Sequence, residues 1–340
     1  MSAVLGPLEY GGPDLPARRL RDLLQAQVDA SPPGSRIDWA TYYFRDRALA
    51  EALIRASDRG VHINLVLEPD PRRAGANDAV IAMLRRHGLN GGFHIYRSWR
   101  SEKGHLHAKI YGFSHPDICW IGSFNPSGDE PEDAEVVGEI GDQDRGHNLL
   151  LPVRSAKLTA ALRGHVGRLA GWSPVPPVLR PAFNRIVKDG GTRLYFYPRL
   201  RPYLVERSIA RLQAGDRVQA AISHLKAGEL TGQLAGAVSR GVTVNLLVHD
   251  TVRRVPSELV EQLTSDGVRV VRVVHKDGLP MHAKFILIEQ RDNRAAWLGS
   301  YNFNKKSRRH NAEVLLRTDD PSTFASLQDR FEVISSMGTP

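Results

Sequence analysis

Two short stretches, one in each half of the chain, decide its fold. The first runs His107-Ala-Lys109 and continues to Trp120-Ile-Gly122-Ser123-Phe-Asn125. The second runs His282-Ala-Lys284 and continues to Trp297-Leu-Gly299-Ser300-Tyr-Asn302. One His-x-Lys pair arises easily by chance, but two pairs that are each followed by the same Gly-Ser-x-Asn block form a strong signal. The repeat indicates a duplicated chain with an equivalent site in each half.

The segments around these blocks repeat as well. Buried strands are expected after Arg59-Gly-Val and after Arg240-Gly-Val, and each follows an alanine-rich, helix-like stretch. Helices are expected at 47–58, 76–87, 229–239 and 256–265, and further strands at 93–97 and 268–274. This β-α-β-α-β order predicts an α/β fold with helices on a mostly parallel or mixed sheet in each half.

A proline-rich connector separates the two halves. Residues 171–181 contain four prolines, which favour a stiff extended connection over a helix or a central strand. We therefore expect two domains, 1–172 with the first His-x-Lys motif and 173–340 with the second. The Gly- and Pro-rich residues 1–16 are expected to wrap over the surface.

Composition and charge narrow the class of protein. The chain has 340 residues, enough for two ordinary domains, and its formal net charge is +9. Such a charge favours a polyanionic partner, either nucleic acid or an anionic lipid surface. However, only nine of the 46 basic residues are lysines, and an arginine bias of this kind can also reflect genomic base composition.

Other classes are excluded more readily. Cys119 is the one cysteine, so no internal disulfide can form, and its apolar surroundings predict a buried, inert thiol. No apolar run is long enough to cross a membrane, and the first residues lack the features of a signal peptide. The expectation is a cytoplasmic protein without a transmembrane segment.

The repeated residues suit phosphate chemistry. A histidine beside a lysine can transfer protons or attack phosphorus, while lysine, serine and asparagine hold phosphoryl oxygens. Phosphodiester cleavage needs one group that attacks in line and another that protonates the leaving oxygen. His107 and His282 would supply both functions across a pseudo-twofold axis. The alternative is a pair of packed core histidines, which would not require the repeated Lys, Ser and Asn.

These two blocks resemble the paired HKD motifs of the phospholipase D superfamily. The resemblance covers roughly residues 35–335, and the second half extends it through Ser307 and Asn311 to Glu313. It implies tandem α/β/α sandwich domains related by pseudo-twofold symmetry. It also implies a covalent phosphohistidine that water or an alcohol resolves, without a metal or other cofactor.

The resemblance assigns a role to each repeated residue. His107 and His282 would be nucleophile and general acid, with His107 favoured as the nucleophile. The remaining residues would hold or support the phosphate: Lys109, Lys284, Asn125 and Asn302 directly, and Ser123, Ser300, Gly122 and Gly299 as support.

Two departures from the family pattern affect this assignment. The aspartate expected after each lysine is replaced by Ser114 and Glu289, with Asp117 and Asp292 close enough to substitute. Glu313 is expected to orient His282, but the parallel first-half position is Leu150. Without such a partner a histidine's tautomer and basicity are less controlled. Candidates to orient His107 are Glu135, Glu139, Asp142, Asp144 or another group.

Neighbouring segments leave the substrate open. An acidic insertion at 126–144 disfavours a nucleic-acid channel if it lies at the site mouth, although it is equally compatible with a solvated loop. The basic clusters Arg253-Arg254 and 305–310 would instead suit anionic headgroups or a phosphate backbone. The second cluster is expected near the site. Tyr96 and Trp99 could stack on a base, contact a lipid interface or anchor a loop. One aromatic residue of 39–44 is expected to wall the pocket.

Three functions remain. The first is hydrolysis or transfer on a phospholipid or another phosphodiester, with peripheral membrane contact possible. The second is a nuclease of the same superfamily, and the third is a binding module that has lost catalysis. Both halves lie in one chain, so a dimer is not needed to complete the site.

Overall fold

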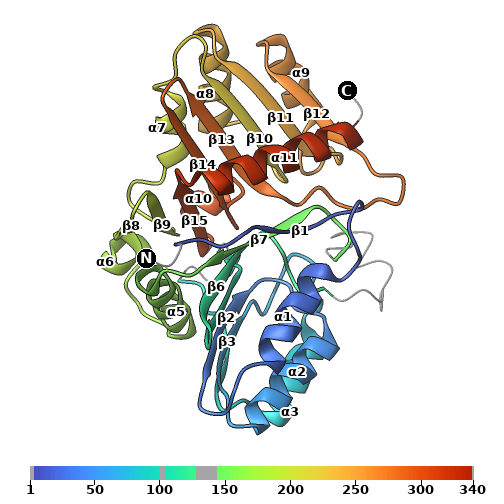
Figure 1. The fold of residues 1–340 in the computed structure, drawn as a ribbon, viewed down its shortest axis with the longest axis vertical. Coiled ribbons are helices and arrows are strands. Elements are labelled where there is room, and N and C mark those ends of the chain that lie inside the picture. The colour runs from blue at the N-terminus through green and yellow to red at the C-terminus, as the bar shows by residue number, and fades with distance from the viewer. Residues whose placement is uncertain (1–3, 100–103, 128–143, 339–340) are drawn as a thin grey trace.

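The computed structural model describes residues 4–99, 104–127 and 144–338. Each half of the chain forms its own mixed sheet, and the two halves are stacked one above the other (Figure 1). The strand order is β1-β7-β6-β5-β2-β3-β4 in the first sheet and β12-β11-β10-β13-β14-β15-β9-β8 in the second. This is the tandem α/β arrangement that the repeated sequence predicted.

The first half packs helices on both faces of its sheet (Figure 1). β2 and β3 are parallel, and every residue of each strand after the first is buried. Each strand has one buried polar side chain in its middle, and the amide of Asn64 donates to Oδ1 of Asp38 at 3.0 Å. Its elements are β1 (Glu9–Gly11), α1 (Arg19–Asp29), β2 (Arg36–Thr41), α2 (Arg47–Asp58), β3 (His62–Leu67), α3 (Asp78–His87), β4 (Gly91–Ile95), β5 (Ile110–Ser114), β6 (Asp117–Gly122), β7 (Asn148–Val153) and α5 (Ala156–Ala170).

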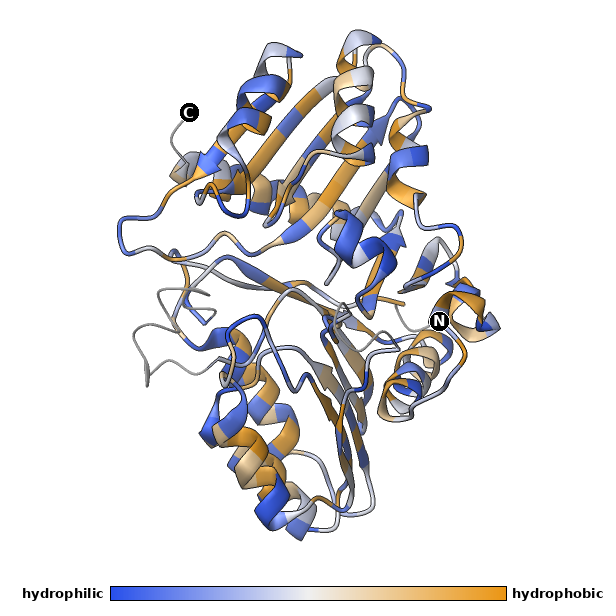
Figure 2. Ribbon diagram, turned by 180° about the vertical axis from the view of Figure 1, so that it is seen from behind, coloured by the Kyte–Doolittle hydropathy of each residue, from blue (hydrophilic) through white to orange (hydrophobic). Residues whose placement is uncertain are grey.

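The second half repeats this plan, with α8 and α9 on one face and the long α11 on the other (Figure 1). Figure 2 shows that its strands are largely apolar, while polar residues are concentrated on the helices. Its elements, after the connector, are η1 (Pro177–Leu179), α6 (Pro181–Asn184), β8 (Val187–Asp189), β9 (Thr192–Tyr197), α7 (Leu204–Ile209), β10 (Arg217–Ile222), α8 (Glu229–Ser239), β11 (Thr243–His249), α9 (Ser257–Ser265), β12 (Arg269–Val273), β13 (Lys284–Gln290), β14 (Asn293–Gly299), α10 (Lys305–Arg309), β15 (Glu313–Thr318) and α11 (Pro321–Met337).

Side-chain caps set where several helices begin. Asp46, Ser155 and Asp320 precede α2, α5 and α11, and each accepts a hydrogen bond from the backbone N–H three residues later. Such a cap satisfies one of the N–H groups that a helix start leaves without a partner, and it typically contributes about 1 kcal/mol. The expected helices at 47–58 and 229–239 match α2 and α8.

Two local expectations need correction. The strand expected at 93–97 instead occupies Gly91–Ile95, where it pairs in parallel with β3. Residues 1–16 do more than cover the surface, because β1 pairs antiparallel with β7 at the sheet edge. Leu5 and Leu8 are buried in the core, and their burial stabilises the packing of this segment against the sheet.

One of the hydrophobic cores spans both domains, and each domain also has a core of its own. A single cluster of buried side chains includes Ile121 and Leu149 from the first sheet and Phe285, Leu298 and Val314 from the second. Cys119 is also buried there, as expected, and burial raises the pKa of its thiol. The expected boundary at residue 172 falls between α5 and η1. Within the described ranges, no helix has the length and apolar character needed to cross a bilayer.

Candidate active site

Strand geometry brings the repeated residues together in each domain. Lys109 directly precedes β5, and Lys284 begins β13. Each of these strands runs antiparallel to the next one, β6 or β14, which ends at the glycine of the Gly-Ser pair, so the start of one lies beside the end of the other. The His-x-Lys pair and the following asparagine are therefore placed together at one end of these strands in each sheet.

Backbone hydrogen bonds across the domain interface join these strand ends of the two sheets. The N–H of His107 donates to the carbonyl of Ala312 at 2.9 Å, and the N–H of His282 donates to the carbonyl of His147 at 3.0 Å. Leu106 thus forms a parallel bridge with Ala312, just before β15, and Met281 forms one with His147, just before β7. The pairing places both histidines at one cavity between the domains.

Each histidine is oriented by a residue of the other domain. Nδ1 of His107 lies 2.8 Å from Oε2 of Glu313, and Nδ1 of His282 lies 2.9 Å from Oδ1 of Asn148. The expectation that Glu313 orients His282 is therefore wrong, because the bridge between Leu106 and Ala312 carries the carboxylate to His107.

The expectation that Leu150 is the first-half counterpart of Glu313 is also wrong, by two residues. Gly122 pairs with Leu150 and Gly299 pairs with Leu315, so Leu150 corresponds to Leu315. By the same register, Asn148 corresponds to Glu313. Among the candidates considered for His107, Glu135, Glu139 and Asp142 lie outside the described residues, as does most of the acidic insertion.

The two serines lie behind the orienting residues. The hydroxyl of Ser123 donates to Oδ1 of Asn148 at 2.9 Å, and that of Ser300 donates to Oε2 of Glu313 at 2.6 Å. Both serines are fully buried, and neither lines the cavity. The structure therefore places them as supports for the orienting groups, which corrects the expectation that they support the phosphate.

The two glycines are also structural. A Cβ on Gly122 would lie 2.0 Å from the carbonyl oxygen of Leu149, and one on Gly299 would lie 2.3 Å from that of Val314. These glycines permit the close approach of the two backbones that lets each serine reach its orienting residue. Neither glycine lines the cavity, so the expectation of substrate contact is corrected here as well.

Both lysines are buried beneath the histidines. Nζ of Lys109 donates to the carbonyl of His107 at 2.7 Å, and Nζ of Lys284 donates to that of His282 at 2.8 Å. Burial lowers the pKa of Lys109 to about 7, although Glu313 opposes the shift. Burial also lowers the pKa of Lys284, and the nearby charge of Lys109 adds to the effect. A bound phosphate would favour the charged form of both groups.

Burial dominates the electrostatics of the histidines too. It lowers the pKa of His107 to about 4, with Glu313 acting in the opposite direction. The pKa of His282 is lowered by burial and then by Lys284 and Arg254. For Glu313, burial raises the pKa, but His107, Lys109 and the Ser300 hydroxyl outweigh it and leave the pKa lowered. An ionised Glu313 can only accept a hydrogen bond, so Nδ1 of His107 carries the proton and Nε2 has a free lone pair.

The cavity above these groups has a volume of about 330 Å³. Tyr42 walls it as expected, with its ring centroid 5.1 Å from that of His107. Oδ1 of Asn302 is buried there and has no partner among the described residues. The described lining contains no carboxylate, and it includes cations from both halves: Arg72, Lys226, Arg253, Arg254 and Lys306.

The substituted aspartate positions have local structural roles. The hydroxyl of Ser114 accepts a hydrogen bond from the backbone N–H of Arg36 at 2.7 Å. Glu289 forms an ion pair with Arg294 at 2.7 Å. Asp117 binds Arg163 and the hydroxyl of Thr159, which ties β6 to α5. Ser114 ends β5 and Glu289 lies near the end of β13, whereas the two lysines lie at the starts of these strands, so these contacts are at the far ends from the site.

Sequence reasoning missed several residues of the site. Asn148, Arg72, Lys226 and His224 were not singled out, although the last three line the cavity. Arg72, Lys226 and His224 come from loops after strands, and these loops carry no repeated motif. A signal existed for Asn148 only, because it begins β7 as Glu313 begins β15.

Comparisons with known proteins identify the family of the chain. A family model described as "Cardiolipin synthase, PLD-like domain" matches residues 24–132 and 209–334, which together are more than half of the chain. The chain belongs to the phospholipase D superfamily. Members of this superfamily are phosphodiesterases and phosphatidyltransferases. No curated protein sequence matches the chain.

Solved structures share the fold at low sequence identity. Phosphatidylserine synthase from Haemophilus influenzae is 13% identical with a TM-score of 0.68, and the match covers 98% of this chain and 87% of that one. Polyphosphate kinase from Porphyromonas gingivalis is 17% identical with a TM-score of 0.66, over 97% of this chain and 47% of that one. This phospholipase D superfamily chain thus spans about half the length of the kinase.

Proposed function

We propose that this protein cleaves phosphodiesters through a covalent phosphohistidine on His107. The observation that carries the proposal is the pair of histidines at one cavity, one held by a carboxylate and the other by an amide. A carboxylate raises the basicity of the ring that it orients, which suits a nucleophile. An amide stabilises the charged ring less, which suits a group that must give up its proton.

The first step forms the intermediate. Nε2 of His107 attacks phosphorus, the bond from phosphorus to the leaving oxygen breaks, and the imidazolium of His282 gives its proton to that oxygen. Lys109 and Lys284 would neutralise the phosphoryl oxygens, and Asn125 and Asn302 would position them. In the second step, His282 takes a proton from water or an alcohol, whose oxygen attacks phosphorus and releases His107.

A phospholipid or a similar small phosphodiester is the favoured substrate. Support comes from the family description, which names cardiolipin synthase, and from the fold shared with phosphatidylserine synthase. The cationic lining without a described carboxylate suits an anionic headgroup. An alcohol acceptor would make the reaction a phosphatidyl transfer, and water would make it a hydrolysis.

A nuclease activity is the second candidate. The same cationic lining, which includes Arg72 and Arg253, also suits a nucleic-acid backbone. A nuclease would lose affinity for DNA steeply as salt rises, whereas a lipid hydrolase would keep its activity on micelles without cleaving DNA.

A substrate panel with a chelator present tests the proposal. The panel contains a phospholipid, a chromogenic bis-ester, and single- and double-stranded DNA. The proposal predicts turnover of the phospholipid and bis-ester with EDTA present, and loss of that turnover in His282→Ala. Preferential DNA cleavage would favour the nuclease, and no turnover of any substrate would favour a binding module. Independence from metals and a cytoplasmic location both stay predictions.

A further inference from the structure

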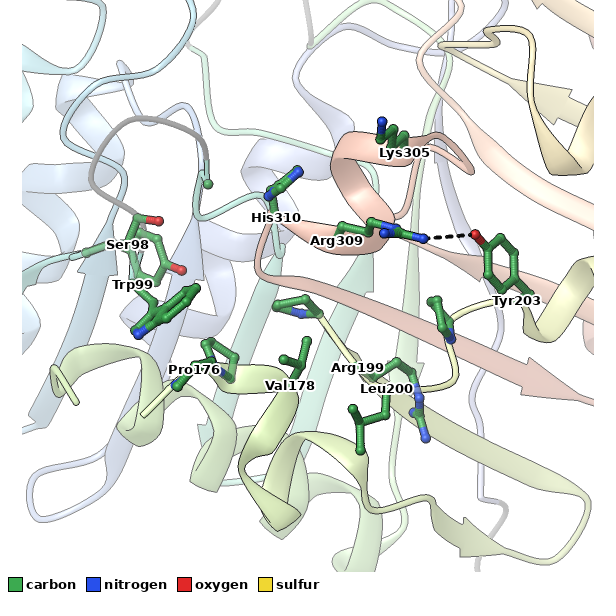
Figure 3. Close-up of a pocket in the computed structure, with 15 residues that line it drawn as sticks. Ser98, Trp99, Pro176, Val178, Arg199, Leu200, Tyr203, Lys305, Arg309 and His310 are labelled. Carbon is green, nitrogen blue, oxygen red and sulfur yellow. Dashed lines mark hydrogen bonds between the residues drawn. The ribbon is translucent and has the colours of Figure 1, made fainter. Parts of the chain in front are cut away.

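A second cavity lies beside the catalytic one, and the short helix α10 borders both. Lys306 and Ser307 of α10 line the catalytic cavity, while Lys305 and Arg309 line the second one. The second cavity has a volume of about 620 Å³ (Figure 3). No step of the proposed reaction uses it, so it needs a separate explanation.

Apolar and aromatic side chains form much of its wall. Figure 3 shows Trp99, Pro176 and Val178 on one side and His310, Arg309 and Tyr203 on the other. The indole N–H of Trp99 donates to the carbonyl of Pro174 at 2.8 Å, which holds the ring against the proline-rich connector. Proline-rich backbone loses little conformational freedom on binding, so this wall is preorganised.

Exposed apolar side chains are concentrated on Trp99 and on residues 172–200, which together contribute several residues to the wall of this cavity. Among the described residues, nine large apolar side chains are exposed, and six of them belong to Trp99 or to residues 172–200. Trp172 is 59% exposed, Leu179 61% and Leu200 63%. Single exposed apolar residues are ordinary, but a cluster with tryptophans marks an interaction surface. Tryptophan is typical of surfaces that contact a membrane at headgroup level.

The charged side chains that line the described part of the cavity are cations. They are Arg199, Lys305 and Arg309, and this part of the lining contains no carboxylate. Residues 171–203 contain six basic residues and one acidic residue, Asp189. The guanidinium of Arg309 donates to the hydroxyl of Tyr203 at 3.4 Å, which joins the helix to the connector side of the cavity (Figure 3). The partner of this surface must therefore combine negative charge with apolar groups.

We propose that this surface docks the protein on an anionic phospholipid bilayer. The docking surface consists of the cations Lys305 and Arg309 and of six exposed apolar side chains: Trp99, Trp172, Val175, Leu179, Ile186 and Leu200. The inference rests on the proposed function, because a phospholipid substrate lies in such a bilayer. The exposed apolar side chains enter the headgroup region while Lys305 and Arg309 meet lipid phosphates. Docking through α10 would place the catalytic cavity close to those headgroups.

Vesicle binding tests the docking surface directly. The full-length protein is sedimented with phosphatidylcholine vesicles, with or without phosphatidylglycerol, at several salt concentrations. Wild type should bind the phosphatidylglycerol vesicles and lose affinity as salt rises. Trp172→Ser/Leu200→Ser and Lys305→Gln/Arg309→Gln should each bind at least about tenfold more weakly. The matched control is Val274→Ser/Val333→Ser, whose exposed apolar residues lie outside the surface and which should bind like wild type.

Turnover of a soluble chromogenic bis-ester separates docking from catalysis. The Trp172/Leu200 variant should keep wild-type turnover and the wild-type melting temperature, while its turnover of lipid in vesicles falls. If wild type turns over the bis-ester but does not bind the vesicles, the docking inference fails and the proposed function stands. If wild type binds vesicles but turns over no phosphodiester, the proposed function fails alone. Unchanged vesicle binding in the variants, or an effect confined to self-association or DNA binding, would overturn the docking surface.

Discussion

Nδ1 of His107 and Oε2 of Glu313 are 2.8 Å apart, although the two residues are separated by 206 positions in the sequence. The carboxylate comes from the second domain and the imidazole from the first. His282 has the reciprocal arrangement, but its partner is the amide of Asn148. The two histidines are thus related by pseudo-symmetry and differ in the charge of the group that orients them, which supports different roles for them.

Glu313→Gln tests this difference through the pH profile. The carboxylate raises the pKa of His107, while burial lowers it to about 4. Removing the charge lowers that pKa further, so the acidic limb of kcat/KM should move to lower pH. The loss of orientation should reduce kcat about 10- to 100-fold. Rates on a soluble bis-ester from pH 3 to 8 measure both effects. A limb that moved to higher pH would contradict the assignment.

Ser300→Ala tests whether the serines act through the orienting residues. The Ser300 hydroxyl donates to Glu313 and lies away from the cavity, so its loss should lower kcat roughly tenfold and leave KM unchanged. Asn302→Ala is the comparison, because Asn302 lines the cavity and its loss should raise KM. A Ser300 variant with raised KM and normal kcat would indicate direct contact with the phosphate instead.

Lys109 should make anion binding depend on pH. Its pKa is lowered by burial to about 7, so it is charged below that value and neutral above it. Sulfate keeps its charge across this range, and its inhibition should therefore weaken as the pH rises from 6 to 8.5. In Lys109→Met the inhibition should be weaker at pH 6 and should vary less with pH. Equal pH dependence in both proteins would exclude Lys109 as the titrating group.

His165 provides a stability test outside the site. Its ring stacks on Phe196 with centroids 4.1 Å apart, and both ring nitrogens are buried without partners among the described residues. Burial lowers its pKa well below the usual value, so the unfolded state binds a proton that the folded state does not. Stability should therefore fall as the pH drops below about 6.5.

His165→Phe should remove this contribution. Its melting temperature should exceed that of wild type by a larger margin at pH 5 than at pH 7.5, as measured by circular dichroism. His62→Gln, at an exposed position, serves as the control. A margin that stayed constant with pH would show that His165 is not the source of the acid sensitivity.

Short-range patterns in the sequence predicted most of the fold and the repeated site residues. His107, Lys109 and Asn125 are brought together by one antiparallel strand pair, so their spacing carries the information. The pairing of Glu313 with His107 depends on a bridge between Leu106 and Ala312 across the interface, which no local pattern encodes. The roles of the serines and glycines were missed for the same reason, since they depend on contacts with β7 and β15.

Trapping the intermediate tests the central claim most directly. His282→Ala should still form the phosphohistidine with a bis-ester that has a good leaving group, because that oxygen needs no proton. Its resolution should be slow, since the base that activates water is missing. Mass spectrometry after an alkaline quench should find the phosphoryl adduct on His107, and His107→Ala should show none. An adduct on His282 in the His107 variant, or undiminished turnover in either variant, would contradict the proposed mechanism.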